Sequence, residues 1–62
     1  MKIAEDNKLY TANEAREILG YAHLSYMYYL IDEGRLQAMK IGRKWRVKGE
    51  WINDYVVRSN VK

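Results

Sequence analysis

Hydrophobic positions recur along this chain with two different periods, and each period predicts a different kind of element. Residues 12–19 and 24–31 carry apolar side chains at three- and four-residue spacing, which is typical of one face of a helix. Residues 39–48 alternate every second position, as a half-buried strand does. Helical spacing returns over residues 51–56. The pattern therefore predicts helix, helix, two strands and helix, in that order.

The first predicted helix, residues 12–19, has clear signals at both ends. Thr11 and Glu14 have the T-x-x-E spacing of a capping box, in which each side chain binds the backbone N–H of the other residue. Gly20 follows the last apolar position and can take the left-handed conformation that ends a helix. The sequence therefore fixes both ends of this helix.

The second predicted helix, Leu24–Glu33, follows after a turn of a few residues and is closed by Gly34. Two short helices joined by a tight turn form a helix-turn-helix unit, whose second helix enters the major groove of DNA. The candidate DNA contacts on this helix are Leu24, Ser25, Tyr26, Tyr28 and Tyr29.

The exposed side of this second helix lacks Arg, Asn and Gln, the residues that bind base edges with paired hydrogen bonds. Hydroxyl groups of Tyr and Ser contact phosphates, and a tyrosine ring can touch a thymine methyl group, so we expect weak base specificity. Two other interpretations stay open. One or two of the tyrosines at positions 21, 26, 28 and 29 fill the core, because the chain has no Phe. Alternatively, the tyrosines form a protein-contact surface.

The stretch M-K-I-G-R-K-W-R-V-K, residues 39–48, predicts a two-stranded hairpin. Met39 and Ile41 alternate with a lysine, and Trp45 and Val47 alternate with basic residues, so we expect one face against the core and one basic face. The turn would be Gly42-Arg43-Lys44, where glycine supplies a positive φ. Because a lone hairpin is marginal in water, it must pack on the helices.

This hairpin holds five cations and no acid within nine residues. Such a density of positive charge at a protruding tip suits a phosphate backbone or a groove, although a basic face that is merely solvated is the alternative. The candidate DNA contacts on the hairpin are Lys40, Gly42, Arg43, Lys44, Arg46 and Lys48.

Charge is unevenly distributed, which strengthens the expectation of a polyanionic partner. The chain of 62 residues has a net charge of +3. Residues 1–34 contain three cations and six acids, whereas residues 35–62 contain eight cations and two acids. The absence of Cys excludes disulfides and thiolate metal sites, and one His cannot form a metal site alone.

Length and composition predict one domain over residues 1–62, with a loose N-terminal arm at 1–8 and a frayed tail at 58–62. An N-terminal arm can also reach a minor groove. No signal peptide or membrane-spanning run is present, so we expect a cytoplasmic protein. We find no nucleophile–base pair and no phosphate-cradling loop, so we expect neither an enzyme nor a cofactor.

A family resemblance covers about residues 9–56. It rests on Leu9-Tyr10-Thr11, Glu14-Ala15, Leu19-Gly20, Leu30-Ile31, Gly34, Leu36, Ala38, Lys40-Ile41-Gly42-Arg43 and Trp45-Arg46-Val47. With this order of elements, the chain resembles the excisionase-type winged helix-turn-helix proteins, relatives of the MerR DNA-binding domain. The resemblance implies a mostly α, α+β fold with a two-stranded hairpin wing and a C-terminal helix.

The resemblance also implies roles for these elements. The second helix would lie in the major groove, the tip at Gly42, Arg43 and Lys44 would approach the minor groove or nearby phosphates, and Trp45 would anchor the wing in the core. Excisionases bend DNA and bias an integrase toward excision, so the implied partners are double-stranded DNA and an integrase. Copies bound side by side on DNA would gain avidity. Some relatives act as transcription regulators instead.

Overall fold

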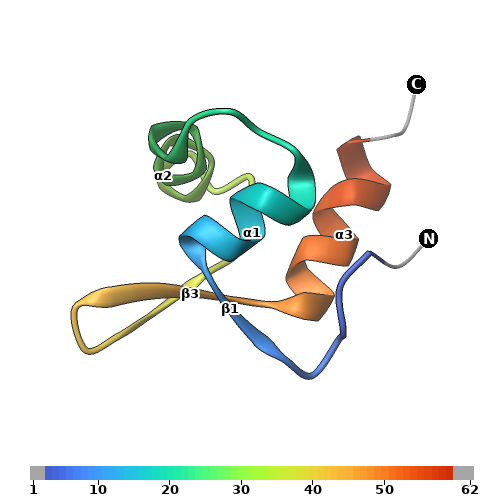
Figure 1. The fold of residues 1–62 in the computed structure, drawn as a ribbon, viewed down its shortest axis with the longest axis horizontal. Coiled ribbons are helices and arrows are strands. Elements are labelled where there is room, and N and C mark those ends of the chain that lie inside the picture. The colour runs from blue at the N-terminus through green and yellow to red at the C-terminus, as the bar shows by residue number, and fades with distance from the viewer. Residues whose placement is uncertain (1–2, 60–62) are drawn as a thin grey trace.

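A computed structural model describes residues 3–59 of the chain, and its elements follow the predicted order with one strand added at the start (Figure 1). The elements are β1 (Leu9–Thr11), α1 (Ala12–Leu19), α2 (Leu24–Asp32), β2 (Met39–Ile41), β3 (Lys44–Lys48) and α3 (Gly49–Ser59). Within this range, no helix is both long enough and apolar enough to cross a membrane.

The ends of α1 confirm the signals seen in the sequence. The Glu14 N–H donates to Thr11 Oγ1 over 3.0 Å, and the Thr11 N–H donates to Glu14 Oε1 over 2.9 Å, which completes the capping box. Gly20 closes α1 in the left-handed region with φ of 81°. Gly34 takes the same conformation after α2, with φ of 75°. The predicted extents of both helices are therefore correct to within one residue.

The sheet has three antiparallel strands in the order β1-β3-β2, so the expected two-stranded hairpin is extended by β1. The added strand is short, and its last residue, Thr11, also caps α1. Three residues next to a helix cap gave too weak an alternation to be recognised as a strand. A third strand matters physically, because a lone two-stranded hairpin is only marginally stable.

The hairpin register differs from the prediction by one residue. Ile41 lies opposite Lys44, and Met39 lies opposite Arg46, so the loop contains two residues, Gly42 and Arg43, rather than three. Opposite residues project from the same face of a sheet, and a one-residue change moves a whole strand's side chains to the other face. Met39 and Ile41 therefore do not pack with Trp45, and they are 37% and 49% exposed.

The sheet thus has an inner face that meets the helices and an outer face that they leave uncovered. The inner face carries Tyr10, Lys40, Trp45 and Val47. The outer face carries Leu9, Thr11, Met39, Ile41, Lys44, Arg46 and Lys48. The inner face leads into the buried core, which consists of Tyr10, Ala15, Met27, Leu30, Leu36, Val47, Ile52 and Tyr55.

The expectation of a loose arm over residues 1–8 is wrong for residues 3–8, which are bound to α3. Oδ1 of the buried Asn53 accepts the N–H groups of Ile3 and Ala4 at 2.8 and 3.0 Å. Its Nδ2 donates to the Ala4 carbonyl and to Asp6 Oδ1, each over 2.8 Å. Position 49 requires glycine, because a Cβ there would overlap the Glu5 carbonyl. The buried amide of Asn53 therefore binds the start of the arm, and the N–H groups of Gly49 and Glu50 bind its end through the carbonyls of Lys8 and Asp6.

The predicted frayed tail, residues 58–62, is likewise ordered as far as it is described. Residues 58 and 59 form the last turn of α3. Arg58 Nε pairs with Asp54 Oδ2 over 2.9 Å, and Arg58 Nη2 donates to the Arg35 carbonyl over 3.1 Å. Residues 1–2 and 60–62 lie outside the described part, so the predictions made for them stay predictions.

Candidate nucleic-acid interface

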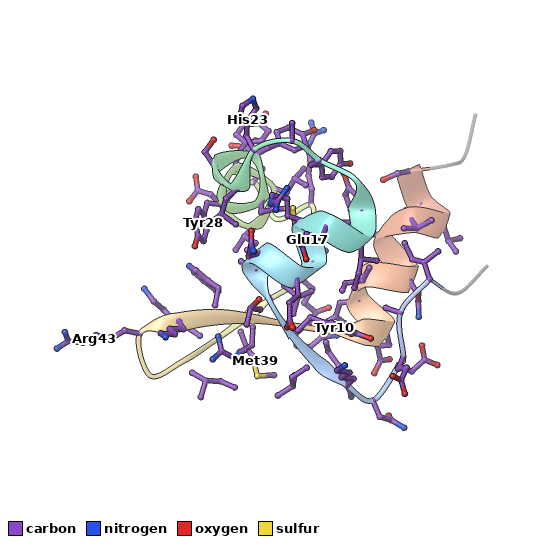
Figure 2. All side chains as sticks on the ribbon, viewed as in Figure 1. Tyr10, Glu17, His23, Tyr28, Met39 and Arg43 are labelled. Atoms are coloured by element: carbon purple, nitrogen blue, oxygen red, sulfur yellow. The ribbon has the colours of Figure 1, made fainter. Side chains whose placement is uncertain are left out.

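Two elements project from the same end of the molecule (Figure 1). One is α2. The other is the wing, which we define as the hairpin of residues 39–48. The helix α3 lies at the opposite end. Arg43 lies at the tip of the wing, far from the rest of the fold, and Tyr28 lies on α2 above the wing (Figure 2).

The core holds α2 by one side and leaves the other side free. Met27 and Leu30 are fully buried, and Leu24 packs against the same cluster. The remaining predicted contacts, Ser25, Tyr26, Tyr28 and Tyr29, are exposed, with the three rings 40%, 44% and 48% accessible. The structure therefore places four of the five predicted residues on the free side of α2 and turns Leu24 inward.

The tyrosines are ordered by contacts with one another. Tyr26 and Tyr29 stack at 5.8 Å between ring centroids with 22° between their planes. Tyr21 meets Tyr26 edge-on at 4.8 Å, and its hydroxyl binds the hydroxyl of the buried Tyr55 over 2.8 Å. We call these four residues the tyrosine chain. Burial, aided by the hydrogen bond with Tyr55, raises the pKa of Tyr21 above its ordinary value.

The tyrosine chain decides between the core and surface interpretations of these rings. Of the tyrosines at positions 21, 26, 28 and 29, Tyr21 alone packs against the core, and the other three are exposed. The stacking of Tyr26 on Tyr29 could have been inferred from their three-residue spacing on a helix. The contact of Tyr21 crosses the turn before α2, and no sequence period predicts it.

Charge on α2 is sparse. The helix contains one acid, Asp32, and no cation.

Beside the wing, Asp32, Tyr28 and Ile31 line a hollow together with the half-buried Trp45. The resemblance implied that Trp45 anchors the wing in the core. Instead Val47 is fully buried, and Trp45 lies at the junction between the wing and α2.

The wing carries its cations on two faces and at its tip, not on one face as expected. Lys40 lies on the inner face, where its Nζ is 5.4 Å from the centroid of the Trp45 ring. Lys44 and Arg46 lie on the outer face. Arg43 lies at the tip, beside Gly42, whose φ of 65° allows the tight turn.

These cations differ in how strongly the protein itself engages them. Lys48 Nζ pairs with Glu50 Oε1 over 2.9 Å, and Arg46 Nη1 donates to the Trp45 carbonyl over 3.2 Å. Within residues 3–59, the side chains of Arg43 and Lys44 make no hydrogen bond or ion pair, and both are exposed. The positive charge that is most available to a partner therefore lies at the tip of the wing.

Residues 3–59 offer neither a metal-binding cluster nor an unpartnered buried polar side chain as an alternative to this surface. No group of three or more His, Cys, Asp or Glu side chains there could hold a metal ion. No buried side-chain nitrogen or oxygen in that range lacks a hydrogen-bond partner. The surface formed by α2 and the wing is therefore the candidate functional site.

Two helices around a tight turn, with an exposed second helix and a β-hairpin beside it, define a winged helix-turn-helix domain. A family model described as "Helix-turn-helix domain" matches residues 9–58, and the chain belongs to this family. Neither curated proteins nor solved structures gave a match. Membership of this family makes DNA the partner of the chain, and helix-turn-helix DNA-binding domains are typically not enzymes.

Proposed function

We propose that this chain binds double-stranded DNA with α2 in the major groove and the wing at the adjacent minor groove or its phosphates. The observation that carries the proposal is the shared direction of the two elements, because α2 and the tip of the wing project from the same end of the fold. An α-helix fits the major groove, and a second element beside it can contact the flanking backbone.

In this arrangement most of the affinity comes from the wing. Arg43 and Lys44 are exposed and carry charges that no described side chain neutralises. Cations that neutralise phosphates release condensed counterions, and this makes binding strongly dependent on salt. The neutral side of α2, with Ser25, Tyr26, Tyr28 and Tyr29, adds contacts that do not depend on charge.

We further propose an excisionase-like role, in which the domain bends DNA at a recombination site and biases an integrase toward excision. The support is the resemblance over residues 9–56, in particular the run Lys40-Ile41-Gly42-Arg43 followed by Trp45 and Arg46. A domain of this size contacts few phosphates, so several copies side by side would be needed for tight binding and bending. An integrase is the implied protein partner.

Two other functions have support in particular features. A small transcription regulator would use the same fold and the same DNA contacts. A protein-interaction module would use the exposed rings of Tyr26, Tyr28 and Tyr29, because exposed tyrosines are enriched at protein interfaces. In that case, alanine at Tyr26 or Tyr29 would weaken partner binding, whereas alanine at Arg43 would not.

The first test is fluorescence anisotropy with a random-sequence duplex at about 50 and 200 mM salt, a range over which phosphate contacts weaken sharply. We expect binding at the lower concentration that falls steeply at the higher one. A duplex that stays unbound at low salt would show that the basic wing is only a solvated surface.

A second test separates the two DNA-binding roles. The chain is mixed with an integrase encoded beside its gene and with a substrate that carries the matching attachment sites. An excisionase-like factor increases excision and bends the site, which energy transfer between dyes at the duplex ends would report. Unchanged excision, together with repression of a neighbouring promoter, would identify a transcription regulator.

A further inference from the structure

We infer that the rings of Tyr26 and Tyr29, which are exposed on α2, recognise the C5 methyl groups of thymine in the major groove. The domain would then select DNA sites by their pattern of thymines, through apolar contacts rather than through hydrogen bonds to base edges. This inference rests on the proposed function, because it requires α2 to lie in the major groove.

The chemistry of the free side of α2 narrows what it can recognise. Ser25, Tyr26, Tyr28 and Tyr29 provide ring surface and single hydroxyl groups. No side chain there offers the two donors that bind guanine or the amide donor and acceptor that bind adenine. The thymine methyl is the one apolar group that normal base pairs present in the major groove. An aromatic ring that is about half accessible therefore matches thymine better than any other base.

Contacts within the tyrosine chain also hold the rings of Tyr26 and Tyr29 in place before DNA binds. Tyr29 stacks on Tyr26 at 5.8 Å, and Tyr26 meets Tyr21 at 4.8 Å. Tyr21 is in turn fixed by the hydrogen bond of 2.8 Å to the buried Tyr55. Because the rings are already ordered, binding loses little side-chain entropy, and a small apolar contact can contribute to selectivity.

The charge of Asp32 on α2 argues against an alternative role for this surface, in which the tyrosine hydroxyls bind phosphates. If the tyrosine hydroxyls mainly bound phosphates, the carboxylate of Asp32 on the same helix would repel the backbone, and α2 has no cation to attract it. The contact between an aromatic ring and a neutral methyl group does not depend on the charge of Asp32. The electrostatics of α2 therefore favour contacts with the bases over contacts with the backbone.

The test compares two duplexes that differ only in methyl groups. One is an alternating A·T duplex, and the other has every dT replaced by dU, which removes the C5 methyl and leaves the hydrogen-bonding groups of the minor groove unchanged. Anisotropy with the full chain at low salt should show tighter binding to the dT duplex, by roughly fourfold for each methyl group that a ring covers. Both duplexes present the same adenine N6 amino groups and contain no cytosine, so a hydrogen bond accepted by Asp32 would contribute equally to both.

Matched variants assign the effect to the rings. Tyr29→Ala and Tyr26→Ala should reduce the ratio of dT to dU affinity toward one. Tyr29→Phe keeps the ring and should keep the ratio, whereas a phosphate-binding hydroxyl would make it lose affinity equally for both duplexes. Thermal unfolding of each variant checks that it is folded, as expected for residues that are 40% and 48% exposed.

Failure of this inference can be distinguished from failure of the proposed function. Equal binding of the dT and dU duplexes, with the salt dependence intact, would overturn methyl recognition and leave DNA binding in place. A methyl preference that persists unchanged in both alanine variants would also overturn it. If neither duplex binds at low salt, the proposed function itself is wrong, and the inference falls with it.

Discussion

The two elements of the candidate interface, α2 and the wing, are built in opposite ways. The helix is fixed to the core by Met27 and Leu30, presents aromatic rings, and carries no cation. In the wing, every residue of β2 is exposed, and cations lie on both faces and at the tip. The rigid element is therefore nearly neutral, and the protruding element is charged.

This difference separates affinity from selectivity. Charge contacts with phosphates act over a long range and are insensitive to sequence, so they tolerate an exposed and adaptable hairpin. Contacts with base edges need fixed geometry, which packing of α2 on the core supplies. It follows that changes in the wing should alter binding to all sequences, and changes on α2 should alter the choice among them.

The largest expected effect tests the difference in packing. Leu30→Ala removes a fully buried side chain beneath α2 and should lower the free energy of unfolding by about 2 to 5 kcal/mol. Ile41→Ala, in the wing, removes a similar side chain that is 49% exposed and should change it by about 0.5 kcal/mol or less. Urea denaturation followed by circular dichroism measures both. Similar losses would show that the wing is packed as tightly as the helix.

The second prediction tests whether the N-terminal arm, residues 3–8, contributes to DNA binding beside α2 and the wing. Asn53→Ala removes the four hydrogen bonds between this side chain and residues 3–6 and should cost about 2 kcal/mol of stability. These hydrogen bonds join the arm to α3, which is not part of the proposed interface. DNA affinity, measured at a temperature where the variant is folded, should therefore be unchanged. Asn13→Ala, on the exposed side of α1, is the control. A loss of affinity in the Asn53 variant alone would mean that the arm contacts DNA.

Much of this fold could be predicted from local patterns in the sequence. The capping box at Thr11 and the glycines after α1 and α2 fixed both helices to within one residue. The alternation over residues 39–48 identified the hairpin and its cations. These signals are local, because a cap or a turn is determined by residues within four positions of one another.

The faces of the wing could not be derived in the same way. They depend on whether the loop has two residues or three, and Gly42-Arg43-Lys44 suits either length. The two-residue loop places Met39 and Ile41 on the outer face, where a three-residue loop would have turned them toward Trp45. The hydrogen bonds between Asn53 and the N-terminal arm were also not predicted, because the bonded residues lie 47 to 50 positions apart in the sequence. Such long-range contacts leave no period in the sequence.

The third prediction tests the charged element by itself. Arg43→Ala should weaken binding to every duplex and reduce the slope of log affinity against log salt by about one unit. Arg58→Ala removes the same charge from α3, where the guanidinium pairs with Asp54 over 2.9 Å, and should leave the slope unchanged. Anisotropy titrations at several salt concentrations give both slopes. Equal slopes for the two variants would remove the tip of the wing from the interface.

The smallest expected effect concerns Tyr21, whose ring packs against Tyr26 of α2. Burial raises the pKa of Tyr21, so the folded protein keeps this proton to a higher pH than the unfolded chain does. The stability that this provides is complete below about pH 10, the ordinary value for tyrosine, and declines as the pH rises above it. Tyr21→Phe should therefore make the decline of stability above that pH shallower.

The same substitution removes the hydrogen bond to Tyr55, so at neutral pH it should lower the stability by about 1 kcal/mol. Tyr28→Phe is the control, because its exposed hydroxyl makes no hydrogen bond within residues 3–59. Since Tyr21 supports α2 and not the wing, the salt dependence of DNA binding should be the same in both variants. A changed slope in the Tyr21 variant would show that the two elements are coupled, and that affinity and selectivity are not separate in this domain.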